Sequence, residues 1–435
     1  MRRPAPRPAP RSWSRRDFLG GLAAAGLVGC RAATTSPGPT SAPEDAANPG
    51  SLGDFSALAG RCDGVSPIAA AEYEARQERA RARCREQGIH GLVCEAGPSL
   101  RYFTGVRWGL SERPLLFVLP VRGDPFFVAP AFEVRTLAES AGDARRIVPW
   151  EEHQSPYAAA RQGLGGAEGT FDVDAEARSF VVDGLRDGAR IARASGPSVI
   201  RELRARKSPT ELALLRRANE ATQAALHAVF AGARIGEGEP EIAAKVHAAL
   251  AAAGLVETWA LVLAGPNASF PHGTSEARAL QDGDTLLIDA GGALHGYRSD
   301  ITRTALVGAV PAETARAWTI VRDAQAAAFA RMRPGAVAGL LDAAARATIV
   351  DGGHGPDYRR FTHRLGHGIG LQVHEWPYLV REASTVLEAG MTMSVEPGIY
   401  VPGSFGIRLE DIVAITDDGV EIFGERAIEA PRISI

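Results

Sequence analysis

The sequence has 435 residues, of which 48 are Lys or Arg and 51 are Asp or Glu, and 45% are hydrophobic. This length predicts two or three domains with large cores. The formal net charge of −3 gives no reason to expect nucleic acid or another strongly charged partner. No internal apolar stretch approaches the ~18 residues that a transmembrane helix needs.

The N-terminus has the pattern of an export signal. Six arginines precede the first acidic residue, Asp17, and a short apolar run follows at residues 18–29. Residues 14–19 resemble a twin-arginine signal, which exports folded proteins in bacteria, and residues 27–30 resemble a lipoprotein cleavage box. The pattern predicts a twin-arginine lipoprotein signal over residues 1–30. Cleavage would leave Cys30 as the lipidated first residue of the mature protein, anchoring it to the membrane on the periplasmic side. In the alternative, this cysteine is an ordinary residue of a discarded peptide.

Residues 31–60 are rich in Ala, Pro, Ser, Thr and Gly and predict a disordered tether, because this composition buries too little apolar surface to fold. Cys62, Cys84 and Cys94 follow without a C-x-x-C pair, so no zinc motif is indicated. The sequence leaves open whether any two of these cysteines form a disulfide, and we interpret them as structural.

Residues 61–205 predict an α/β domain. Ser66 followed by Pro67 predicts a helix start, and Gly88 predicts its end. Strands are expected at 91–94, 115–121 and 126–128, and helices alternate with strands to about residue 200. The region has no glycine-rich phosphate loop, dinucleotide fingerprint or nucleophile-elbow serine. It therefore does not indicate a function by itself.

A second domain is expected over residues 206–435. Ser208 and Glu211 form a capping box around Pro209, which predicts a long helix to about residue 231. A second helix is expected at about 239–253, before a glycine that would end it.

Two aspartates in this second domain are placed to meet. Asp289 ends an apolar strand beginning at residue 285, and Asp300 lies in the partner strand at 296–304. A hairpin would bring the two carboxylates together. A buried carboxylate costs several kcal/mol unless it is paired or bound to a cation, and no cationic partner is obvious. The pair therefore points to a metal, although each Asp taken singly could simply end a strand.

Two glutamates repeat the arrangement near the C-terminus. Glu396 ends an apolar run at 393–396, and Glu410 lies inside the apolar run 407–415. Pairing of Arg408 with Glu410 is the structural alternative to metal binding. Carboxylates together with an imidazole suit a pair of divalent ions such as manganese.

Three histidines, His363, His367 and His374, alternate with glycines at positions 366, 368 and 370. Each glycine costs about 1 kcal/mol in a helix, so an extended segment is expected, with the first two histidines on a common face. Hydrogen-bonded core histidines are the alternative.

These segments together resemble the creatinase/prolidase metallopeptidases of the "pita-bread" fold. Five positions fall in that family's order and context: Asp289, Asp300, His367, Glu396 and Glu410. Residues 363–375 are very close to its histidine signature, and residues 265–273, with His272, look like its substrate-side histidine segment. Residues 65–205 resemble the N-terminal domain of the proline-specific branch, through Tyr102-Phe-Thr-Gly105 and Glu112-Arg-Pro114; methionine aminopeptidases usually lack this domain. The implied fold class is α+β, a pita-bread domain preceded by a smaller α/β domain.

The resemblance implies two divalent ions, with Mn²⁺ preferred over Co²⁺ or Zn²⁺. Asp289 would chelate one ion, His367 and Glu396 the other, and Asp300 and Glu410 would bridge both. A bridging hydroxide would then attack the scissile carbonyl.

The other site residues follow from the same resemblance. Glu396 would shuttle the proton, and His272 and His374 would bind the substrate and stabilise the tetrahedral intermediate. His363 would line the pocket beside the proline ring, and Arg408 would orient Glu410. The glycines would leave room for the substrate backbone.

The implied function is hydrolysis of the Xaa-Pro bond at the N-terminus of short proline-containing peptides, by a homodimer. Dipeptidase and aminopeptidase are not distinguished, nor is the residue before proline. A nonpeptidase hydrolase or lyase on the same scaffold, acting on a small amidine, amide or zwitterion, is the alternative. A metal-free binding module is disfavoured, because no ligand position has been lost.

Overall fold

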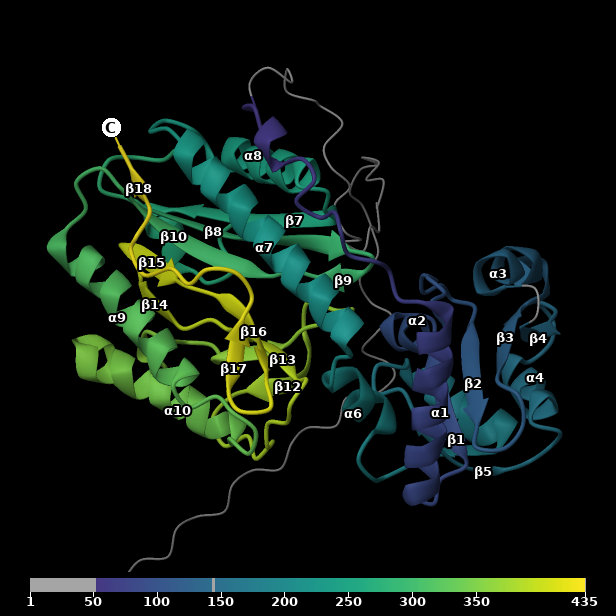
Figure 1. Ribbon diagram of the computed structural model, residues 1–435. Coiled ribbons are helices and arrows are strands. Elements are labelled where there is room, and N and C mark those ends of the chain that lie inside the picture. The colour runs from purple at the N-terminus through teal and green to yellow at the C-terminus, as the bar shows by residue number, and fades with distance from the viewer. Residues whose placement is uncertain (1–51, 143–144, 435) are drawn as a thin grey trace, which may run out of the picture. The chain divides into compact units, whose positions relative to one another are not determined.

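The computed structural model describes residues 52–142 and 145–434 (Figure 1). The predicted signal, Cys30 and residues 31–51 of the tether lie outside the described residues. Residues 56–58 already form a 3-10 turn whose Leu58 is buried, so the folded chain begins before the predicted end of the tether at residue 60. None of the described helices is long and apolar enough to cross a membrane.

The N-terminal domain is built on a six-stranded mixed sheet with the order β4-β3-β2-β1-β5-β6. Its strands are β1 (Gly91–Glu95), β2 (Leu116–Pro120), β3 (Phe126–Pro130), β4 (Arg146–Trp150), β5 (Gly169–Val173) and β6 (Ile191–Arg193). Its helices are α1 (Ala70–Glu86), α2 (Pro98–Thr104), α3 (Val134–Ala141), α4 (Pro156–Gly163), α5 (Ser179–Gly184) and α6 (Val199–Ala205). The expected strands at 91–94, 115–121 and 126–128 are therefore confirmed.

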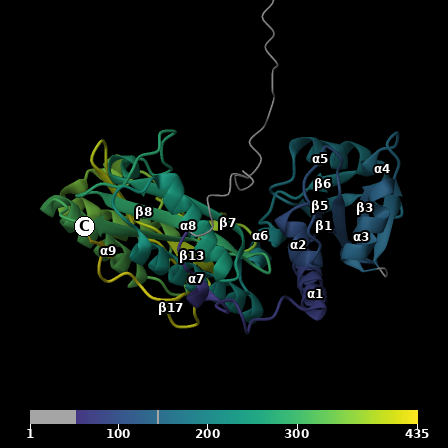
Figure 2. The same ribbon diagram turned by 90° about the horizontal axis from the view of Figure 1, so that it is seen from above.

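Both faces of this sheet are covered, as every residue of β1, β2 and β3 is buried. Alternate residues of a strand point to opposite faces. Leu92 and Cys94 accordingly join the core with α1 and α2, whereas Val93 joins a separate core with α4 and α5 (Figures 1 and 2). This explains the runs of consecutive apolar residues in the sequence.

The predicted start of the first helix is wrong by about three residues. The helix α1 begins at Ala70, with Ala69 in an extended conformation at its N-cap. The preceding residues stay extended because Val65 and Ile68 pack against the core. Its end is as expected, since Gly88 has a positive φ of 67° directly after the C-cap residue.

The second domain contains two larger sheets, with the orders β18-β10-β8-β7 and β12-β11-β13-β16-β17, and a hairpin of β14 and β15. The first sheet comprises β7 (Val256–Ala264), β8 (Thr285–Leu294), β10 (Ile301–Val307) and β18 (Arg432–Ile433), with β9 (Tyr297–Arg298) paired to β8. The other strands are β11 (Gly366–Gly368), β12 (Glu375–Leu379), β13 (Thr392–Val395), β14 (Gly398–Val401), β15 (Phe405–Arg408), β16 (Asp411–Ile415) and β17 (Val420–Ile422).

Four long helices pack on these sheets: α7 (Pro209–Gly232), α8 (Glu239–Ala252), α9 (Ala312–Phe329) and α10 (Ala338–Ile349). The helices α7 and α8 share a core with β7, β8 and β10, and α9 and α10 share another with β12, β13 and β16 (Figure 1). The capping box of α7 is confirmed: Glu211 N donates to Ser208 Oγ, and Ser208 N donates to Glu211 Oε2.

The hairpin that carries the two aspartates differs from expectation at one point. The strand β8 does not end at Asp289 but continues to Leu294. It continues through Gly291, where a Cβ atom would lie only 1.9 Å from the carbonyl oxygen of Ser299, so glycine here permits close strand approach. Antiparallel pairing sets Asp289 opposite Thr302, and Asp300 lies just before β10. The two carboxylates thus come together as predicted.

A candidate metal centre

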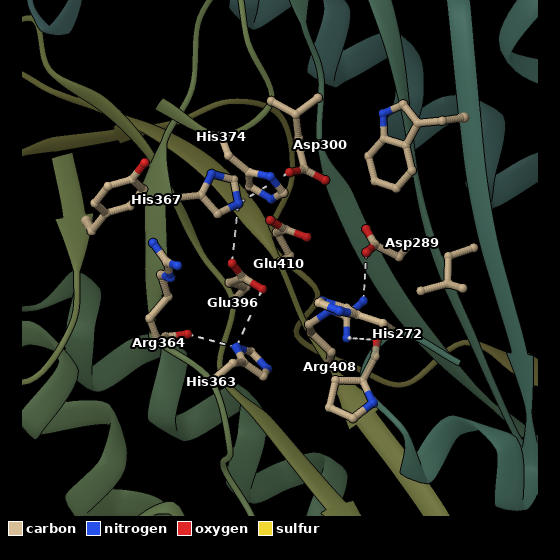
Figure 3. A pocket seen from close by; sticks show the side chains of 15 residues that line it. His272, Asp289, Asp300, His363, Arg364, His367, His374, Glu396, Arg408 and Glu410 are labelled. Atoms are coloured by element: carbon tan, nitrogen blue, oxygen red, sulfur yellow. Dashed lines mark hydrogen bonds and ion pairs between the residues drawn. The ribbon is translucent and has the colours of Figure 1, made fainter. Parts of the chain in front are cut away.

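A cavity of about 600 Å³ in the second domain brings together the predicted site residues (Figure 3). It is lined by all nine of them: His272, Asp289, Asp300, His363, His367, His374, Glu396, Arg408 and Glu410. They come from both larger sheets, from the β14–β15 hairpin and from connecting segments. The apolar run around Glu410 is not one continuous strand. Glu410 lies in the two-residue junction between β15 and β16.

The ligand-type atoms form three overlapping groups, in each of which they lie within 4.8 Å of one another. The groups are Asp289–Asp300–Glu410, His367–Glu396–Glu410 and Asp300–His367–His374. Asp300, Glu410 and His367 each belong to two groups. Only Asp300 and Glu410 are shared between the group of Asp289 and the groups of His367, as residues that bridge two ions must be. The third group adds His374, which the sequence reasoning had assigned to the substrate alone.

The electrostatics of the cluster favour a bound cation. Asp300 is 3% exposed and Glu410 2% exposed. Burial raises the pKa of both carboxyl groups well above the ordinary range, and the neighbouring carboxylates raise it further. Burial also raises the pKa of Glu396 to about 8. One oxygen of Asp289, Oδ1, is buried without a hydrogen-bond partner. Hard oxygen donors crowded in this way fit divalent ions.

The surroundings of His367 favour its neutral form, which is the form that binds a metal ion. Burial lowers its pKa to about 3. Its Nδ1 lies 3.1 Å from the carbonyl oxygen of Gly368, to which the N–H of this tautomer donates. The other ring nitrogen, Nε2, then presents a lone pair 3.4 Å from Glu396 Oε1 and 3.5 Å from Asp300 Oδ2.

Arg408 binds a different carboxylate from the one expected. Its Nη2 donates to Asp289 Oδ2 at 2.7 Å, so Asp289 does have a cationic partner. The link to Glu410 is indirect: Arg408 Nε donates to Thr302 Oγ1, and Thr302 Oγ1 donates to Glu410 Oε2 at 2.7 Å. The sequence reasoning missed Thr302, although it lies two residues after Asp300, on the same face of an extended chain.

Tyr400 is a second site residue that the sequence patterns did not indicate. Its hydroxyl group contacts both Arg408 and His363. Arg408 Nη1 lies 3.0 Å from the Tyr400 hydroxyl, and His363 Nε2 lies 2.7 Å from it. His363 precedes β11, whereas His367 lies within it, so the expectation of a common strand face is wrong. Both side chains nevertheless reach the cavity (Figure 3).

The three glycines of this segment allow neighbouring parts of the protein to pack closely against its backbone. A Cβ atom at Gly366 would lie 2.0 Å from the carbonyl oxygen of Ser394 in β13, and one at Gly368 would lie 2.6 Å from that of Trp376 in β12. A Cβ at Gly370 would lie 2.6 Å from Glu375 Oε1. This corrects the expectation that the glycines leave room for a substrate backbone.

A cluster of four carboxylates and neutral imidazoles in a pita-bread fold defines a metallopeptidase. The model of metallopeptidase family M24 matches residues 213–417, and that of the creatinase/prolidase N-terminal domain matches residues 76–205. The chain is 37% identical over 351 residues to the probable dipeptidase PepE of Mycobacterium tuberculosis strain H37Rv, covering 80% of this chain and 93% of the relative. It is 31% identical to the Xaa-Pro dipeptidase of Lactobacillus delbrueckii subsp. lactis, covering 78% and 94%.

Solved structures agree. Dipeptidase PepE from Mycobacterium ulcerans has a TM-score of 0.80 at 35% identity, covering 85% of this chain and 100% of that one. A prolidase from Thermococcus sibiricus has a TM-score of 0.75 at 29% identity, covering 83% and 99%. The chain belongs to the creatinase/prolidase metallopeptidase family and is a peptidase. The predicted α+β fold class is confirmed.

Proposed function

We propose that the protein is a dipeptidase that hydrolyses the Xaa-Pro bond with two divalent ions. The observation that carries the proposal is that Asp300 and Glu410 both lie in the ligand group of Asp289, and that each also lies in a ligand group of His367, on the wall of one cavity. The similarity to proteins described as Xaa-Pro dipeptidase and as prolidase supports the substrate class.

We assign two ions in the arrangement expected from the sequence, which the overlapping ligand groups support. Asp289 would hold one ion, His367 and Glu396 the other, and Asp300 and Glu410 would be shared. When bound, such ions supply Lewis acidity and lower the pKa of water towards neutrality. Mn²⁺ is our candidate, because the donors are mostly hard oxygens.

The side chains around the ligands have separate tasks in this proposal. Glu396 Oε2 lies 3.8 Å from His363 Nδ1, and the carboxylate would pass a proton from the attacking water to the leaving nitrogen. His272 and His374 line the same cavity and would donate hydrogen bonds to the carbonyl oxygen as negative charge develops on it. His363 would pack beside the proline ring.

One arginine in the wall of the cavity, Arg364, favours a dipeptide over a longer peptide as the substrate. Arg364 lines the cavity and its side chain is exposed. Among the described residues, no carboxylate lies within ion-pair distance of it, whereas Arg408 is paired with Asp289. The guanidinium lies over the Tyr378 ring, 4.4 Å from its centroid. It would bind the free carboxylate that a dipeptide carries directly after the scissile bond.

The test is an assay of a soluble form beginning at residue 52, which retains the buried Leu58. The protein is loaded in turn with Mn²⁺, Co²⁺ or Zn²⁺ and offered Xaa-Pro dipeptides, Xaa-Ala dipeptides and Xaa-Pro-Xaa tripeptides. We expect proline release from the first class at the highest kcat/KM. Turnover of none of these peptides would favour a nonpeptidase hydrolase or lyase instead. The mass of the protein in solution tests the predicted homodimer.

A further inference from the structure

A buried ion-pair cluster lies behind the loop that carries His374. Glu375 is 5% exposed, and its two carboxylate oxygens accept hydrogen bonds from Lys207 Nζ at 2.7 Å and Arg204 Nη2 at 2.6 Å. The two cations are also buried, at 6% and 7% exposure. Arg204 lies near the end of α6, and Lys207 lies between α6 and α7. None of the three residues lines the cavity of the metal centre.

The loop itself has little regular structure. Residues 370–374 connect β11 to β12 without strand pairing of their own, and the β11–β12 register shifts just before them. One backbone hydrogen bond holds the loop, from Arg298 N to Gly370 O at 2.8 Å. Side chains add to it: Arg204 Nη2 also donates to Gln372 Oε1 at 2.5 Å, and Gln372 Nε2 donates to Glu176 Oε2 at 2.8 Å. Gly370 packs directly on the ion pair, because its Cβ would lie 3.0 Å from Lys207 Cε.

His374 and Glu375 are adjacent in the sequence, and their side chains have different surroundings. That of His374 lines the cavity, and that of Glu375 does not. The His374 ring faces the cavity, with its centroid 4.2 Å from that of His367 (Figure 3). The Glu375 carboxylate, which does not line the cavity, is held by the two cations. An anchor at Glu375 therefore fixes the position from which His374 reaches the substrate.

Stability alone is a weak reason to bury three charges. Taking charges out of water costs several kcal/mol per ion, and well-packed apolar replacements are often as stable. We infer that Glu375, clamped by Lys207 and Arg204, is a positioning residue that holds His374 against the substrate. This inference rests on the proposed function. It assigns to the segment that joins the two domains a direct part in arranging the active site.

A double-mutant cycle between Lys207 and His374 tests the inference. Lys207→Met removes one cation and leaves Arg204 to pair with Glu375. In the wild-type background we expect kcat on an Xaa-Pro dipeptide to fall about 10- to 100-fold, since small displacements of reacting groups are costly. In the His374→Ala background the same change should add little, because the group that it positions is gone. Metal content of Lys207→Met should stay at the wild-type value.

Two further variants separate positioning from folding. Gly370→Ala pushes on Glu375 without removing a charge and should show the same coupling to His374. Arg76→Met breaks another buried pair, with Glu211, and serves as the matched control, because neither residue lines the cavity. It should lower the melting temperature and show no coupling. Equal losses of kcat from Lys207→Met in both backgrounds, unchanged kcat, or lost metal would each overturn the inference.

Failure of the proposed function and failure of the positioning role give different results in this experiment. Absence of any wild-type activity on Xaa-Pro dipeptides contradicts the proposed function, whereas additive behaviour of the variants on an active enzyme contradicts only the positioning role. Melting temperatures of the metal-free variants, measured alongside, show whether a loss of kcat merely follows a loss of folded protein.

Discussion

Asp289 and Arg408 form an ion pair of 2.7 Å in the wall of the metal centre (Figure 3). The same guanidinium donates to Thr302 and Tyr400, so one side chain connects a predicted ligand with the supports of Glu410 and His363. A planar fork with several donors can do this, whereas an ammonium cannot reproduce the geometry.

Arg408→Lys should therefore lower kcat about 100-fold or more, although the charge is kept. Metal content should also fall, because Asp289 and Thr302 lose their shared donor. Steady-state kinetics and elemental analysis measure both quantities. Arg381→Lys, in the exposed pair with Asp357, is the control and should leave both unchanged. Equal behaviour of the two variants would show that Arg408 contributes only charge.

The sequence predicts the ligands of this site better than their supports, for a physical reason. An acid within an apolar run, such as Asp289 or Glu410, is conspicuous because burying it alone is costly. Thr302 and Tyr400 are ordinary strand residues, and only the register of the strands brings them to Arg408. The same holds for the end of β8, which depends on how closely Ser299 approaches Gly291. Long-range packing of this kind is not encoded in local spacing.

The sharing of ligands predicts different metal losses for the two aspartates. Asp300 belongs to two ligand groups and Asp289 to one. Asp300→Asn should therefore abolish binding of both ions, while Asp289→Asn should retain about one. Elemental analysis after dialysis gives the stoichiometry. A ligand at 100 times its dissociation constant stabilises a protein by about 2.7 kcal/mol, so Mn²⁺ should raise the melting temperature of the wild type and not of Asp300→Asn. Full retention of metal in Asp300→Asn would contradict a dinuclear site.

The partly buried His363 predicts a loss of stability in acid. Burial lowers the pKa of His363 from 6.5 to about 3. Below pH 6.5 the unfolded chain binds a proton that the folded chain does not, so stability is present above this pH and falls as the pH drops towards 3. The slope is at most about 1.4 kcal/mol per pH unit for each such histidine. Urea unfolding of the metal-free protein between pH 7 and pH 4 measures it. His363→Asn should give a shallower slope, and an unchanged slope would contradict the assignment.

The N-terminal pattern predicts a membrane anchor that the described residues do not include. We propose that Cys30 is lipidated after export of the folded protein by the twin-arginine route. Cys30→Ser should move the protein from the membrane fraction to the soluble periplasmic fraction, and replacing Arg15 and Arg16 by Lys should retain it in the cytoplasm. Folded export would let Mn²⁺ be loaded away from competing zinc and copper. Full activity of protein secreted unfolded and given manganese outside the cell would contradict this reason.

Arg364 predicts how the enzyme chooses the length of its substrate. If its free guanidinium binds the carboxylate of a dipeptide, Arg364→Ala should raise KM for Xaa-Pro about 10- to 100-fold, the range expected for a lost charge-assisted hydrogen bond of 1.5–3 kcal/mol. The corresponding Xaa-Pro amide lacks the carboxylate, so its KM should be high in the wild type and little changed in the variant. The ratio of the two KM values isolates the contact, because any general damage to the site affects both substrates alike. A variant that loses activity equally on acid and amide would place the carboxylate elsewhere and leave tripeptides as equally good substrates.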